Sequence, residues 1–139
     1  MIGSYVMTEH NVTGKRRAKH SIGLGTYGVD MHAVRRIIHD GQPVAEGTIG
    51  VSVRRPYPIE YAALTPRVVE CDNLLATFAL SASHVAFGSI RMEPTFMMVS
   101  QAAGTTASLA IDADAAVQAV DYERLRKQLI STGAVLEWN

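Results

Sequence analysis

The chain has 139 residues, which suits one domain of ordinary size, and 47% of them are hydrophobic, enough to bury a core. Basic and acidic residues number 13 each, and this zero net charge argues against an electrostatic nucleic-acid binder. No apolar run reaches the ~20 residues of a membrane span, and the N-terminus lacks the pattern of a signal peptide. We therefore expect a cytoplasmic protein with neither a nucleic acid nor a membrane as partner.

Neither cysteine nor histidine indicates a metal site. Cys71 is the single cysteine, which excludes an intramolecular disulfide and a cysteine-based zinc site. The five histidines show no metal-ligand spacing, so we assign no metal. The basic run of residues 15–17 is short and local, and we interpret it as a solvated surface patch.

The first half of the chain combines extended segments with one short helix. Extended structure is expected over residues 4–12, 48–53 and 59–64, with a loop over 13–20. The hydrophobic spacing of residues 31–38 predicts a helix over about 31–39, with Asp30 as its N-cap and Gly41 at its end. The continuous apolar run at 74–80 predicts a buried strand.

A glycine pattern precedes that helix. Gly23, Gly25 and Gly28 match G-x-G-x-x-G, the pattern of a dinucleotide-binding turn. A functional fingerprint follows a buried strand, and the preceding residues, GKRRAKHS, are too charged for one. We interpret the three glycines as a turn before the helix.

The second half of the chain is mainly helical. After a loop of small residues at 81–94, Pro94 opens a helix that runs to about Ile111. Ser100, Gly104 and Ser108 lie on one face of this helix, where another backbone can approach closely. A last helix begins at Asp121 and ends at Gly133. These elements predict one domain over residues 1–139 with a mixed α/β fold, a small sheet and about three helices.

Several motifs resemble one family of flavoenzymes. NLL at 73–75, SASH at 81–84, GSIRMEP at 88–94 and QAAGTTASL at 101–109 follow one another. This segment resembles the C-terminal part of the FAD-dependent oxidoreductases that include the xanthan lyase-related proteins. The resemblance extends back through residues 21–32 and forward through 120–129, and so covers almost the whole chain. Ser100 stands where the family has glycine, and Ala62 where it often has arginine.

The resemblance implies that the chain is a C-terminal portion of such an enzyme. Family members are larger, and their N-terminal part carries the βαβ unit that holds the adenosine and pyrophosphate. We expect this chain to bind FAD weakly or not at all alone and to need the missing N-terminal FAD-binding domain or subunit as its partner. Catalytic residues, substrate and electron acceptor stay unassigned.

The resemblance also implies two groups of site residues. Its flavin-facing loop and helix start correspond to Ser83, His84, Gly88, Ser89, Ile90, Arg91 and Met92. Helix N-terminal N–H groups suit a flavin oxygen that gains negative charge on reduction. His32, Tyr57 and Tyr61 are candidates for a substrate pocket. A tight loop that feeds a buried helix without any ligand is an equally good interpretation, with His84 as a structural residue and the two tyrosines as half-buried strand residues.

An alternative function is a non-catalytic binding or oligomerising domain. The apolar helix at 95–111 would be exposed without its partner domain, and exposed apolar patches mark association sites, so a homo-oligomer is expected. An independent hydrolase fits poorly, because Ser81, Ser83 and His84 are too close in sequence for a triad and no G-x-S-x-G elbow occurs.

Overall fold

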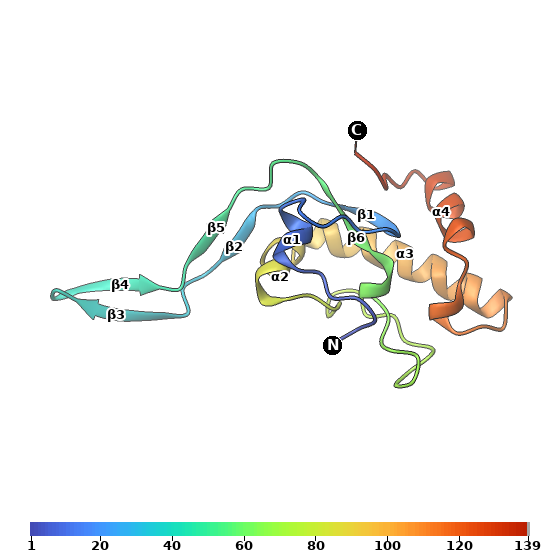
Figure 1. Cartoon of the computed structure of the whole chain (residues 1–139), viewed down its shortest axis with the longest axis horizontal. Helices are drawn as coiled ribbons and strands as arrows, with labels where there is room; N and C mark the ends of the chain where they lie inside the picture. Colours follow the sequence, from blue (N-terminus) through green and yellow to red (C-terminus); the bar gives the residue numbers. More distant parts are fainter. Residues whose placement is uncertain (139) are drawn as a thin grey trace.

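The computed structural model describes residues 1–138 and shows a helical body from which a long extension of paired strands projects (Figure 1). We call this extension, residues 29–51, the β-arm. The described part contains four α-helices: α1 (Glu9–Val12), α2 (His84–Ile90), α3 (Glu93–Asp112) and α4 (Tyr122–Ser131). It also contains two 3-10 turns, η1 (Tyr61–Ala63) and η2 (Val117–Ala119). The strands are β1 (Ser21–Gly25), β2 (Val29–Met31), β3 (Arg35–His39), β4 (Gln42–Glu46), β5 (Ile49–Val51) and β6 (Tyr57–Glu60). The predicted mixed fold is confirmed.

The strands form three separate antiparallel pairs, β1–β6, β2–β5 and β3–β4. The β1–β6 pair lies against α3, the longest helix of the described chain (Figure 1). Ile22 of β1, Ile59 of β6 and Val99 of α3 are fully buried in the shared core. The core continues under α4 through Leu125 and Leu129, which lie on the buried face of that helix.

Two of the three pattern glycines lie inside β1, so the predicted turn is wrong for them. At Gly23, φ is +156°, and an added Cβ would lie 2.1 Å from Sδ of Met98 on α3. At Gly25, an added Cβ would lie 2.4 Å from the ring of Tyr57. Both glycines let the strand approach its neighbours closely. The third, Gly28, immediately precedes β2.

The helix predicted over 31–39 is also wrong, because Met31 ends β2 and residues 35–39 form β3, both in the β-arm. β3 and β4 pair in register from Arg35 with Glu46 to His39 with Gln42. Asp40 and Gly41 join them with φ of 50° and 73°, as a two-residue type I′ turn requires. Every residue of β4 is exposed and β3 buries only Ile37 in part, so neither face of this hairpin is covered by the described chain.

Two further predicted strands are absent from the described residues. In the segment 4–12, Met7 makes only an isolated bridge to Ala82, and Thr8 caps the short helix α1. Residues 74–80 form turns and irregular structure, with Leu74 47% and Phe78 69% exposed. The extended segments predicted near 48–53 and 59–64 are confirmed in part, as β5 and β6.

The predicted C-terminal helices are confirmed, and one helix was not predicted. α3 begins at Glu93 with Pro94 in its first turn, and Asp121 caps α4 by accepting a hydrogen bond from the N–H of Glu123. The loop predicted over 81–94 instead contains α2, which Ser83 caps by accepting from the N–H of Ala86.

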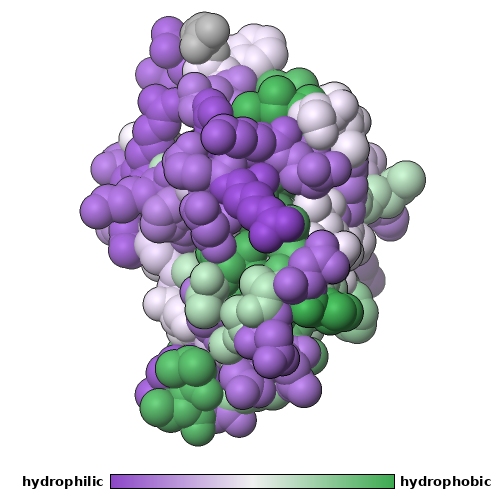
Figure 2. Space-filling view, turned by 90° about the vertical axis from the view of Figure 1, so that its right-hand side faces the viewer, coloured by the Kyte–Doolittle hydropathy of each residue, from purple (hydrophilic) through white to green (hydrophobic). Residues whose placement is uncertain are grey.

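The end of the molecule that carries α4 is mainly hydrophilic, with small separate apolar patches (Figure 2).

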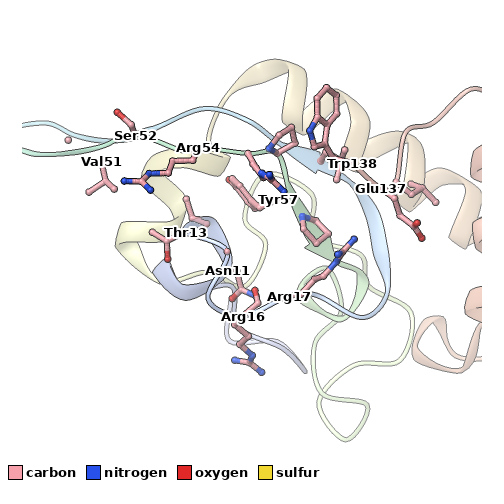
Figure 3. A pocket seen from close by; sticks show the side chains of 18 residues that line it. Asn11, Thr13, Arg16, Arg17, Val51, Ser52, Arg54, Tyr57, Glu137 and Trp138 are labelled. Atoms are coloured by element: carbon pink, nitrogen blue, oxygen red, sulfur yellow. The ribbon is translucent and has the colours of Figure 1, made fainter.

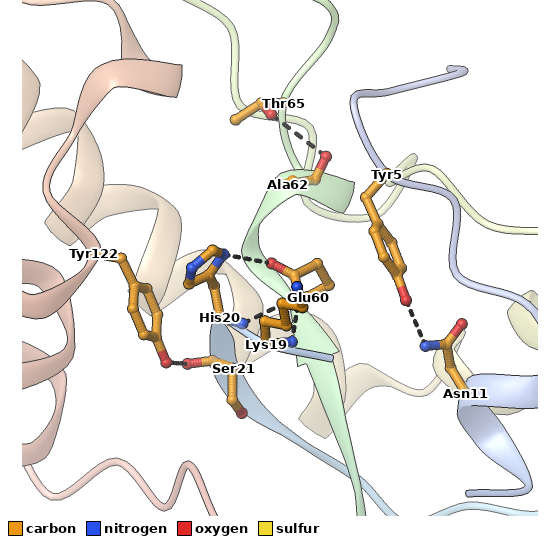
Figure 4. Close-up of polar contacts among 9 residues, drawn as sticks. All are labelled: Tyr5, Asn11, Lys19, His20, Ser21, Glu60, Ala62, Thr65 and Tyr122. Atoms are coloured by element: carbon orange, nitrogen blue, oxygen red, sulfur yellow. Dashed lines mark hydrogen bonds and ion pairs between the residues drawn. The ribbon is translucent and has the colours of Figure 1, made fainter. Parts of the chain in front are cut away.

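A buried carboxylate fixes the start of β1 against the end of β6 (Figure 4). Oε2 of Glu60, a residue only 3% exposed, accepts hydrogen bonds from the backbone N–H groups of Lys19 and His20, at 2.7 and 3.1 Å. Its Oε1 lies 3.2 Å from Nδ1 of His20. On the other side, the Tyr122 hydroxyl donates to the carbonyl of Ser21, which ties α4 to the same strand.

Candidate functional site

The junction between α2 and α3 is the candidate site, because five of the predicted flavin-facing residues lie there. Gly88, Ser89 and Ile90 form the last turn of α2, Arg91 is its C-cap, and Met92 is the N-cap of α3. Met92 supplies no side-chain cap, so the first N–H groups of α3 lack that usual partner. The 20-residue helix therefore presents its positive end at this junction.

A charged cluster lies beside this helix end. The guanidinium of Arg91 donates to the carbonyl of Asp30, at 3.3 Å, and lies 3.4 Å from the Asp30 carboxylate. His32 joins the cluster, with Nε2 3.4 Å from the same carboxylate and 3.5 Å from the guanidinium. All three side chains are more than one third exposed, so solvent screens the ion pair. The fold thus brings a predicted substrate residue to a predicted flavin residue.

A buried hydroxyl chain lies on the inner side of the junction. The Ser89 hydroxyl donates to the carbonyl of Tyr27, so its oxygen accepts the hydrogen bond from the Tyr57 hydroxyl, 2.7 Å away. Burial raises the pKa of Tyr57 to about 12, and the hydrogen bond to Ser89 offsets only part of this rise. Tyr57 is therefore a neutral hydrogen-bond donor across the ordinary pH range.

Three of the predicted flavin-facing residues have structural roles inside this chain. Gly88, Ser89 and Ile90 are buried. An added Cβ at Gly88 would lie 3.2 Å from the Asp30 carbonyl oxygen, so this glycine permits α2 to pack on β2. Arg91 and Met92 are the partly exposed members of the set at the junction.

Tyr61, Ser83 and His84 lie elsewhere. The Tyr61 hydroxyl donates to the carbonyl of Val117, and burial raises its pKa to about 12, with the hydroxyl of Thr106 close by. Thr106 is fourteen residues after Met92, or roughly 21 Å along α3, so Tyr61 does not join the junction. Ser83 and the exposed His84 mark the opposite end of α2 from Arg91.

Sequence reasoning missed Asp30 as a member of the site. Its interpretation as a helix cap hid its position on β2, where residues alternate between two environments. The available signal was the short alternation of Val29, Asp30 and Met31, whose two apolar members are buried.

Two absences hold for residues 1–138. No group of three or more histidine, cysteine, aspartate or glutamate side chains in this range is arranged to hold a metal ion. Among the helices of the same range, none has the length and apolar character needed to cross a membrane.

Family comparison identifies the type of protein to which these elements belong. No curated protein and no solved structure gives a significant match to this chain. The family model described as FAD dependent oxidoreductase matches residues 1–129, which include β1, β6, α2, α3 and the whole junction. The chain therefore belongs to the FAD dependent oxidoreductase family.

Proposed function

We propose that this chain is the C-terminal part of an FAD-dependent oxidoreductase, of the xanthan lyase-related kind, and completes a flavin site whose nucleotide-binding half lies on another domain or subunit. The family match supports the cofactor class. The sheet topology supports placing the nucleotide-binding half on another domain or subunit, because all three strand pairs of the described chain are antiparallel. A dinucleotide-binding βαβ unit requires parallel strands joined by a helix.

The junction of α2 and α3 has donors that suit a flavin. The uncapped N-terminus of α3 and the Arg91 guanidinium both favour an oxygen that carries negative charge. FAD, when bound, supplies the hydride or electron transfer. This chain's own residues would hold the ring: Arg91 would donate to it, and Asp30 would keep the guanidinium in place.

The exposed face of α3 supports a partner domain. Ser100, Gly104 and Ser108 are exposed along this face, and Met97 and Ile111 near its two ends are 73% and 79% exposed. An added Cβ at Gly104 would meet no atom of the described chain within 4 Å. Small side chains between two apolar ones provide room for a closely packed neighbour, which we take to be the nucleotide-binding half.

The first experiment is flavin retention. The purified chain is mixed with FAD, desalted and measured by visible absorbance, alone and after co-expression with a family βαβ half. We expect no flavin on the chain alone and an equimolar amount on the complex. Tight equimolar binding by the chain alone would show that the second half is unnecessary.

Two variants separate the flavin contact from the docking face. Arg91→Gln should weaken flavin binding about tenfold in the complex, as loss of a charge-assisted hydrogen bond predicts, while the complex still forms. Gly104→Leu should prevent the complex from forming and leave the fold of the isolated chain unchanged. Arg124→Gln, on the exposed face of α4, is the matched control and should change neither property.

The second candidate is a non-catalytic homo-oligomer, favoured by the same exposed residues Met97 and Ile111. It predicts a dimer or higher oligomer in light scattering that Gly104→Leu converts to a monomer. A wild-type chain that is monomeric at all accessible concentrations would contradict this candidate and leave the flavoenzyme proposal intact.

A further inference from the structure

A second site is suggested by a cavity of about 780 Å³ (Figure 3). None of the junction residues 88–92 lines it, and it is linked to the junction through Tyr57, whose hydroxyl is hydrogen-bonded to Ser89. Its walls come from four parts of the chain: the end of α1 and the loop after it, Leu24 of β1, the segment from β5 to β6, and residues 136–138. A volume of this size is within the range of small-molecule sites.

Four arginines give the cavity its charge. Arg16 and Arg17 come from the first segment, and Arg54 and Arg55 from the second. In the view of Figure 3, Arg17 and Arg54 lie on opposite sides of Tyr57. The short basic run that looked like a solvated patch in the sequence is therefore placed beside a second arginine pair 38 residues further along the chain.

The positive charge of these four arginines is not neutralised by carboxylates of the described chain. None of the four arginines forms an ion pair with a carboxylate of residues 1–138. Glu137 also lines the cavity, but its carboxylate is bound to Arg126, with Oε1 3.1 Å from the guanidinium nitrogen. Arg16 lies over the ring of Tyr5, 4.4 Å from its centre, which restricts that guanidinium to one wall.

The other walls are apolar and partly aromatic. Pro56, Tyr57 and Pro58 form one of them, and Trp138 lies beside Glu137 in the C-terminal segment. Guanidinium groups bind carboxylate and phosphate oxygens through paired hydrogen bonds and also stack on flat rings. A cavity that combines four guanidiniums with such walls suits a small molecule that carries more than one anionic group.

We propose that this cavity binds a multiply anionic small molecule through Arg17, Arg54 and Arg55, with phosphate or carboxylate groups as the recognised chemistry. The proposal is independent of the flavin assignment, because the cavity needs neither the α3 N-terminus nor a second domain. Its open side leaves the arginines exposed to solvent, so binding should weaken as ionic strength rises.

Tryptophan fluorescence tests the proposal directly, since Trp138 is the only tryptophan of the chain and lines the cavity. The full chain is titrated with inorganic pyrophosphate in one arm and citrate in the other, at low salt. We expect saturable quenching or enhancement in the millimolar range or below in at least one arm. The arm with the lower Kd identifies phosphate or carboxylate as the preferred group, and equal values mean that the cavity binds both groups without distinguishing them.

Matched double variants show whether the cavity is responsible. Arg17→Gln with Arg54→Gln should raise the Kd about tenfold or more, because two guanidinium contacts are lost. Arg36→Gln with Arg124→Gln removes the same charge from exposed positions outside the cavity and should leave the Kd within about twofold. Circular dichroism checks that each variant is folded. If the Arg17→Gln, Arg54→Gln double variant is unfolded, the single variant Arg55→Gln takes its place.

Two results would overturn the proposal. One is the absence of a saturable signal with both anions, confirmed by calorimetry. The other is an equal loss of affinity in the cavity variant and the control variant, which would mean that the anions respond only to net charge.

Discussion

The Tyr57 hydroxyl lies 2.7 Å from Oγ of Ser89 and so joins β6 to the last turn of α2, 32 residues further along the chain. Both residues are buried, and the Ser89 hydroxyl donates a hydrogen bond to the backbone carbonyl of Tyr27, just before β2. One hydroxyl chain therefore connects the body of the molecule, the candidate flavin junction and the base of the β-arm.

Removing the first hydroxyl of this chain should lower stability. Tyr57→Phe deletes one buried hydrogen bond and leaves the Ser89 hydroxyl still paired with the Tyr27 carbonyl. We expect the free energy of unfolding to fall by about 1 kcal/mol in urea denaturation. Tyr27→Phe is the control, because Tyr27 contributes only its backbone carbonyl and its side chain is 41% exposed. An effect of Tyr27→Phe as large as that of Tyr57→Phe would contradict this account.

Alkaline pH should destabilise the fold. Burial raises the pKa of both Tyr57 and Tyr61 to about 12, whereas in the unfolded chain each titrates near 10.0. Their contribution to stability is therefore fully present below pH 10 and is lost as pH rises toward 12, by a few kcal/mol at most.

Urea midpoints measured at intervals between pH 9 and pH 12 check this expectation, with tyrosinate absorbance recorded in parallel. The Tyr57→Phe and Tyr61→Phe double variant should show a flatter decline than the wild type. A wild-type midpoint that stays constant between pH 10 and about pH 12 would contradict the burial of the two hydroxyl groups, because that burial raises both pKa values to about 12.

Local signals predicted the C-terminal helices well. Pro94 in the first turn of α3 and Asp121 as the cap of α4 act through neighbouring backbone groups, so the sequence near each helix is sufficient. In contrast, residues 31–39 satisfy helical spacing, yet Asp40-Gly41 forms the tight turn of a hairpin. The spacing of a few apolar residues did not distinguish a helix from an exposed strand.

The candidate site depends on contacts that the sequence does not reveal. Arg91 and His32 are 59 positions apart, and only the packing of α2 on β2 brings them together. Family resemblance pointed to each residue separately, but Asp30, which contacts both, had a plausible local role as a helix cap. Long-range packing places Asp30 on a strand beside Arg91 and His32 and not at the start of a helix.

The close approach of β1 to α3 should make Gly23 intolerant of a side chain. In Gly23→Ala, the new methyl group would meet Met98, and φ of +156° is one that L residues rarely adopt. We expect a loss of about 1–3 kcal/mol, reduced if Met98 can move. Gly104→Ala makes the same change on the open face of α3, where we expect a gain of about 0.5–1 kcal/mol in urea denaturation. Equal effects at the two positions would contradict the packing described here.

Glu60 should stabilise the β1–β6 pair far more than an exposed glutamate does at the surface. Glu60→Ala leaves the N–H groups of Lys19 and His20 without the carboxylate oxygen that both now share, and it removes a buried side chain. We expect a loss of about 2–3 kcal/mol, because two hydrogen bonds to a buried, charged carboxylate are lost. Glu70→Ala is the control: its exposed pair with Arg67 should contribute less than about 1 kcal/mol. Hydrogen exchange should also become faster at the N–H groups of Lys19 and His20 in Glu60→Ala alone, and exchange that stays unchanged there would mean that the carboxylate does not hold the start of β1.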